Sequence, residues 1–120
     1  MKKRTNYFLA FLVILGIILI FTGVDYLAHL ISPDYSVPSY YFKNKIIFGT
    51  IYGFIAYLFI KNQAPMKKAL IFSATISILL QLRYYFIEHY SLEFVLEFLV
   101  IHFAILLPLS YLAFKYIKRI

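Results

Sequence analysis

Four ionisable side chains, Asp25, His29, Arg83 and Glu97, lie within or at the edge of long apolar stretches of this chain. Asp25 and His29 are four residues apart, which places both on one face of a helix, about one turn from each other. An ionised side chain at the centre of a bilayer costs about 3 kcal/mol on insertion scales, so such residues face one another or a polar cavity. The spacing therefore predicts a cluster of ion-binding or ligand-binding residues inside a membrane.

Arg83 is the residue that most needs a partner, because its guanidinium stays protonated. We expect it about two turns from the end of its helix and Glu97 about one and a half turns into the next, so that both match the depth of Asp25. One interpretation is a structural ion pair, formed by Arg83 with Asp25 or Glu97, that sets how the helices face one another. The other is a polar cavity open to the outside, in which two carboxylates against one guanidinium leave a surplus negative charge suited to a cation or a proton.

The same acids and imidazoles are candidate ligands for a metal ion. Glu93 and Glu97 share a helix face, and Asp25, His29 and His102 add oxygen and nitrogen donors of the kind that Zn, Cu, Mn and Fe accept. None of the helix motifs typical of metal sites is present, and His102 lies about 140° round the helix from Glu97. No cofactor is therefore predicted, and a metal ion held by Glu93 or His102 stays an alternative.

Long apolar segments must position these residues. Hydrophobic types make up 63% of the 120 residues and charged types 14%, which indicates that lipid is the surrounding solvent. The apolar runs predict an all-α membrane protein, a single domain over 1–120 with four transmembrane helices in a bundle, at 6–30, 41–60, 69–90 and 92–116, joined by short loops. Most Lys and Arg flank one side of these runs, which places the N- and C-termini in the cytoplasm. Lys43 and Lys45 are then outside, with side chains extended toward the headgroups.

Small residues indicate where helices can approach one another closely. Gly49 and Gly53 form a Gly-x-x-x-Gly, and Ser73 with Ser77 repeats the spacing on the following segment. Such pairs favour helix packing, either within the bundle or between subunits.

The sequence also argues against several classes of function. With no cysteine, the chain has no thiolate ligand, disulfide or Cys nucleophile. The net charge of +7 comes from residues beside apolar runs rather than from a basic face with interleaved aromatics, so no nucleic acid is expected as a partner. Neither a nucleophile elbow nor a phosphate loop is present, which argues against an enzyme.

These features predict a multi-pass protein of the cell membrane that serves as an accessory or assembly subunit of a membrane complex. A small bundle buries little surface on its own, so we expect contact with membrane lipid and a homo- or hetero-oligomer formed through transmembrane helices. The alternative is a proton- or cation-coupled small transporter or channel that acts as an oligomer. A membrane-embedded enzyme or metal-binding protein is a second alternative.

Overall fold

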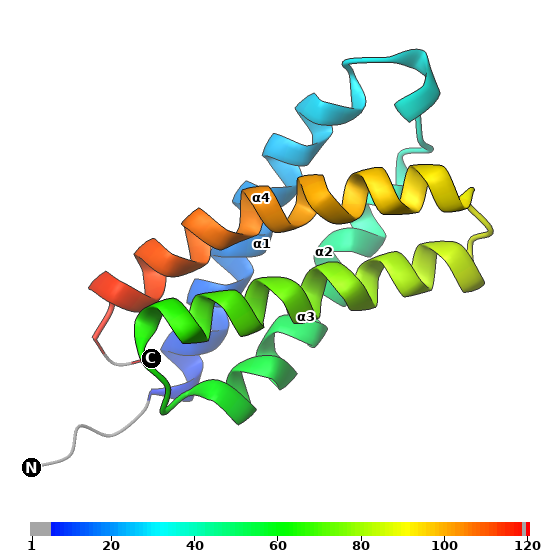
Figure 1. Ribbon diagram of the computed structural model, residues 1–120. Coiled ribbons are helices and arrows are strands. Elements are labelled where there is room, and N and C mark those ends of the chain that lie inside the picture. The colour runs from blue at the N-terminus through cyan, green and yellow to red at the C-terminus, as the bar shows by residue number, and fades with distance from the viewer. Residues whose placement is uncertain (1–5, 119) are drawn as a thin grey trace, which may run out of the picture.

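The computed structural model describes residues 6–118 and 120, which form four α-helices and one short 3-10 turn (Figure 1). The elements in chain order are α1 (Tyr7–His29), the turn η1 (Pro33–Tyr35), α2 (Tyr40–Ile60), α3 (Pro65–Phe86) and α4 (Leu92–Tyr116). The prediction of an all-α fold is confirmed for these residues. We call the end of the bundle at which α1 and α3 finish, and α2 and α4 begin, the η1 end.

Local sequence explains where the helices begin and end. The side chain of Asn6 accepts a hydrogen bond from the Leu9 N–H at 3.0 Å, and Ser91 does the same for Phe94 at 3.2 Å, so α1 and α4 both start at capping residues. The third helix ends at Phe86 rather than at 90 as predicted. The reason is His89, whose φ of 61° is a left-handed conformation that no α-helix continues.

Three of the helices, α1, α3 and α4, are long and apolar enough to cross a membrane. Large apolar side chains also face outward along the bundle, among them Phe8 at 72% and Val100 at 68% exposure, as contact with lipid requires. These observations indicate a membrane protein. The helix α2 has 21 residues, but Lys43 and Lys45 in its first turns lower its hydropathy. That α2 also crosses the membrane therefore stays a prediction.

The basic residues that predict the side of the termini are only partly within the described chain. Lys2, Lys3, Arg4 and Arg119 lie outside the described residues. The orientation of the bundle in a membrane therefore also stays a prediction.

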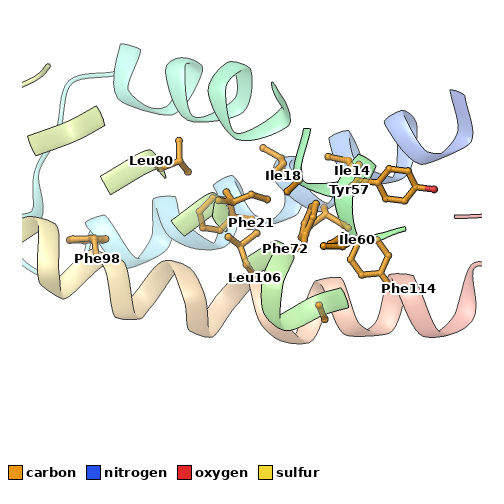
Figure 2. Close-up of a cluster of buried hydrophobic side chains, with 14 of the residues drawn as sticks. Ile14, Ile18, Phe21, Tyr57, Ile60, Phe72, Leu80, Phe98, Leu106 and Phe114 are labelled. Carbon is orange, nitrogen blue, oxygen red and sulfur yellow. The ribbon is translucent and has the colours of Figure 1, made fainter. Parts of the chain in front are cut away.

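Each helix packs against two neighbours, in the order α1, α2, α3, α4 and back to α1. Apolar side chains fill the space between them (Figure 2). In the half of the bundle away from the η1 end, the core is built from residues such as Ile14, Ile18, Phe72, Leu106 and Phe114. Most of the buried ionisable side chains enter the core in the other half, while Lys68 near the start of α3 is buried in this one.

The Gly-x-x-x-Gly pair lies inside the bundle, where α2 meets its neighbours. A Cβ added to Gly49 would lie 3.3 Å from Ile18 of α1, and one added to Gly53 would lie 3.0 Å from Ile14. Ser73 is fully buried and donates to Ser110 Oγ of α4 at 3.4 Å, while Ser77 is buried beside it. The small residues thus let α2 and α3 approach the other helices of the same chain.

A large side chain at Gly53 should destabilise the bundle, since its Cβ alone would lie 3.0 to 3.2 Å from side chains of α1 and α3. We expect Gly53→Leu to lower the free energy of unfolding by about 1–3 kcal/mol, the range for overpacked cores. The matched control is Gly16→Leu in α1, where a Cβ would meet nothing within 4 Å. Thermal unfolding of both variants in detergent checks the prediction, and equal melting temperatures would contradict it.

Candidate functional site

Four ionisable side chains from three helices meet in the η1 half of the core. Asp25 and His29 come from the last turns of α1, Lys45 from the start of α2 and His102 from the middle of α4. All four are buried, and the side chains of Asp25, Lys45 and His102 have 0% exposure. We call these residues the Asp25 cluster.

The Asp25 carboxylate is the centre of this cluster. Its Oδ2 accepts a hydrogen bond from the Lys45 ammonium and lies 3.0 Å from His29 Nε2, while Oδ1 lies 3.2 Å from His102 Nε2. Lys45 Nζ is also 2.9 Å from His102 Nε2. Because an ammonium can only donate, Lys45 donates to both groups, and His102 turns an Nε2 lone pair toward the cluster.

The orientation of His29 is determined by the turn that follows it. His29 Nδ1 lies 2.7 Å from the carbonyl oxygen of Tyr35, which can only accept, so Nδ1 carries a proton. The opposite nitrogen, Nε2, faces a carboxylate oxygen of Asp25, which also accepts. A stable contact between these two atoms therefore requires either a second proton on the ring or a cation held beside them.

Aromatic rings enclose the cluster. Lys45 Nζ lies 4.5 Å from the ring centroid of Tyr41 and 5.2 Å from that of Phe21, distances at which ring faces attract a cation. Phe98 stacks on the His29 imidazole, with centroids 4.1 Å apart and an interplanar angle of 7°. These contacts cover the ammonium and the imidazole, which are both buried.

The composition of the cluster reverses the charge balance expected from the sequence. Two carboxylates against one Arg were predicted, but the structure gathers one carboxylate, Asp25, with three nitrogen bases, Lys45, His29 and His102. Such a set carries no surplus negative charge. Its nitrogen donors suit a proton or a transition metal rather than a hard cation that prefers oxygen.

Arg83 does not join Asp25 or Glu97, which corrects the predicted ion pair. Its Nη1 lies 3.6 Å from Glu88 Oε2, and its guanidinium carbon lies 4.0 Å above the ring centroid of Phe48. Because α3 ends at Phe86, Arg83 belongs to the last turn of that helix and reaches the following loop. The guanidinium therefore lies nearer the bundle surface than the depth estimate implied.

Glu97 and Glu93 lie at a separate, open hollow at the η1 end. This hollow of about 210 Å³ is lined by Ser32, Asp34, Tyr35, Ser91, Glu93, Phe94 and Glu97. Of the two candidate metal ligands, Glu93 therefore lies at this hollow and His102 lies with Asp25. Asp25, His29 and His102 offer ligand atoms within 4.8 Å of one another, the arrangement of the described residues that suits a metal ion.

Lys45 is the site residue that the sequence reasoning missed, since it was predicted to extend toward the headgroups. A signal was available in the helical spacing. Lys45 lies four residues before Gly49 and eight before Gly53, so it shares the face of α2 that packs against other helices. Lys43, two residues earlier, is exposed, as the sequence predicts for both lysines.

Removal of the Lys45 ammonium should strongly destabilise the fold, since Asp25 would be left buried without its cation. We expect Lys45→Met to lower the free energy of unfolding by about 3–5 kcal/mol, as when one partner of a buried pair is lost. The matched control, Lys43→Met on the exposed face, should stay within about 0.5 kcal/mol. Thermal unfolding in detergent compares the two, and adding Asp25→Asn to Lys45→Met should recover part of the loss. Similar melting temperatures for the two single variants would show that the cluster does not hold the bundle.

Tyr35 in η1 provides a test by titration. The Glu97 carboxylate, as a hydrogen-bond partner and a nearby negative charge, raises the pKa of the Tyr35 hydroxyl above its usual value of about 10. The resulting contribution to stability is present below about pH 10 and is lost as the pH rises through the raised pKa. Glu97→Gln should lower the pKa of Tyr35, as read by ultraviolet difference titration against Tyr35→Phe. Glu88→Gln serves as the control, and an equal shift from it would refute the contact.

Comparison of this chain with protein-family models, with curated proteins and with solved structures finds no match. The Asp25 cluster and the surfaces of the helices are therefore the features of this chain that bear on its function.

Proposed function

We propose that this protein crosses the cell membrane four times, with both termini in the cytoplasm, and serves as an accessory or assembly subunit of a membrane complex. Three helices are long and apolar enough to span, and α2 extends over a comparable 21 residues in the same bundle. The positive residues Lys61, Lys67, Lys68, Lys115 and Lys118 flank the helix ends opposite the η1 end, which supports that orientation.

The observation that carries the proposal is the closure of the Asp25 cluster. Its charged groups contact one another and the Asp25, Lys45 and His102 side chains have no exposed surface, while Asp25 Oδ1 and His102 Nδ1 are buried without a hydrogen-bond partner among the described residues. A substrate site needs an opening, whereas an interhelical ion cluster needs only to be dry and well paired. The closed cluster therefore supports a role in holding three helices in a defined arrangement.

The rest of the core gives less support to transport through a single chain. Between the cluster and the opposite end of the bundle, most core side chains are apolar, such as Ile14 and Phe72 (Figure 2), with buried polar groups such as Ser73, Ser110 and Lys68 among them. Protons and cations cross membranes through chains of polar groups or water. The mostly apolar half of the core therefore favours a subunit over a transporter.

A furrow between α3 and α4 is the surface that we propose for the partner. One hollow of about 350 Å³ is lined in part by Ala74, Ile78, Leu99 and Ala104, and a second of about 280 Å³ shares Ile78 and Leu99 with it. The lining is apolar, and the two alanines leave room for close approach of another backbone.

The occupant that fits this furrow is a transmembrane helix of another protein. Ser77 Oγ lies buried at its base and has no hydrogen-bond partner among the described residues. This hydroxyl is covered by its neighbours, so Ala74 and Ala104 are the residues that favour a helix, because their small side chains let another backbone approach closely. The furrow also runs lengthwise between α3 and α4, so a third helix can lie along it.

Site-specific photocrosslinking in native membranes tests this proposal. A photoreactive amino acid at Ala104 should join the chain to one defined membrane protein, identified by mass spectrometry. The same amino acid at Ile20, exposed on α1, is the matched control and should give no such product. Ala74→Phe should fill the furrow and abolish the crosslink, while Ile20→Phe should leave it intact.

The outcomes separate the candidate functions. A crosslink from Ala104 only to a second copy of this chain would overturn the subunit proposal and favour a homo-oligomeric transporter. A crosslink only to lipid would overturn the proposed occupant of the furrow.

A further inference from the structure

We propose that Asp25, His29 and His102 form a binding site for one divalent transition-metal ion of the zinc class, at which the metal and the Lys45 ammonium alternate. This proposal concerns the interior of the bundle and does not depend on a partner at the α3–α4 furrow. The metal would join α1 to α4 through three ligands, where Lys45 now joins α1, α2 and α4.

The spacing of the three side chains fits a small tetrahedral ion. Asp25 Oδ2 lies 3.0 Å from His29 Nε2, Asp25 Oδ1 lies 3.2 Å from His102 Nε2, and the ligand atoms of all three residues fall within 4.8 Å of one another. Zinc ligands at about 2.0–2.2 Å in a tetrahedron are separated by about 3.4 Å. Small side-chain rotations therefore bring the three ligands to one ion.

The Nε2 atoms of both histidines already face the Asp25 carboxylate. The Nδ1 of His29 donates to the Tyr35 carbonyl at 2.7 Å, the kind of hydrogen bond that orients a metal-binding imidazole. The Nε2 of His102 faces Lys45 Nζ at 2.9 Å as an acceptor. A metal ion can replace a proton or an ammonium at these nitrogens after only small rotations of the side chains.

Lys45 marks the position of the cation. Its Nζ contacts both Asp25 and His102, two of the three proposed ligands. A divalent ion and an ammonium repel each other strongly in a buried site, so they exclude one another. Lys45 begins near the start of α2, about one and a half turns from Tyr40, so its long side chain can extend toward the η1 end when the metal enters.

The set of donors selects the class of metal. Two imidazoles and one carboxylate suit zinc and its transition-metal neighbours, whereas calcium and magnesium prefer six or more oxygens. Three protein ligands leave a fourth position for water or another donor.

Metal binding to the purified full chain, prepared without a polyhistidine tag and stripped with a chelator, tests the proposal. Isothermal titration with Zn²⁺ and metal analysis after gel filtration should give one zinc per chain. Substitution with Co²⁺ should give the intense visible absorption of a tetrahedral site. His102→Gln should weaken zinc binding by about 100-fold or more, while the matched control His89→Gln, which changes an exposed histidine outside the cluster, should leave it unchanged.

Lys45→Met keeps all three ligands and removes the competing ammonium, so zinc should offset the stability that this variant loses when Asp25 is left without its cation. We expect this variant to bind zinc about tenfold or more tightly than the unsubstituted chain, and zinc to raise its melting temperature.

If the unsubstituted chain does not bind zinc at micromolar concentrations, the proposal is overturned, even if Lys45→Met does bind it. Binding that survives His29→Gln and His102→Gln would also overturn it, because the ion would then lie elsewhere. The crosslinking result at Ala104 does not affect zinc binding, so the partner proposal and the metal-site proposal can be refuted independently.

Discussion

The structure depends on the contact between the Asp25 carboxylate and the Lys45 ammonium inside an apolar bundle. Either charge alone would be expensive to bury, and together they attract strongly because the surrounding dielectric is low. The pair therefore restricts the rotation and depth of α2 relative to α1. His102 extends the same restriction to α4, since its Nε2 lies 3.2 Å from Asp25 and 2.9 Å from Lys45.

Close packing makes this contact possible. Gly49 and Gly53 follow Lys45 by about one and two turns on the same face of α2, and Ile18 and Ile14 of α1 press against them. A bulkier residue at either glycine would push α2 outward and carry the ammonium away from Asp25. Backbone approach and ion pairing thus stabilise each other, which is a common way for membrane helices to replace the hydrophobic effect that lipid does not supply.

The chemistry of the chain is divided between its interior and its surface. The Asp25 cluster is nitrogen-rich, dry and closed by Tyr41, Phe21 and Phe98, so it suits a proton or a transition metal that orders the bundle. The acidic hollow with Glu93 and Glu97 is open at the η1 end, and the apolar furrow between α3 and α4 faces outward. The surface proposed for a partner helix and the charged core therefore consist of different residues.

The sequence by itself determined the helices and the length and apolar character that suit three of them to cross a membrane. It also determined the proximity of Asp25 to His29, because helical spacing decides which residues of one segment share a face. It did not determine partners on different helices. Arg83 matched Asp25 in estimated depth, yet α3 ends early and the guanidinium pairs with Glu88. Only the tertiary structure decided that Lys45 and His102 face Asp25, since the relative rotation and axial position of helices follow from how their side chains pack.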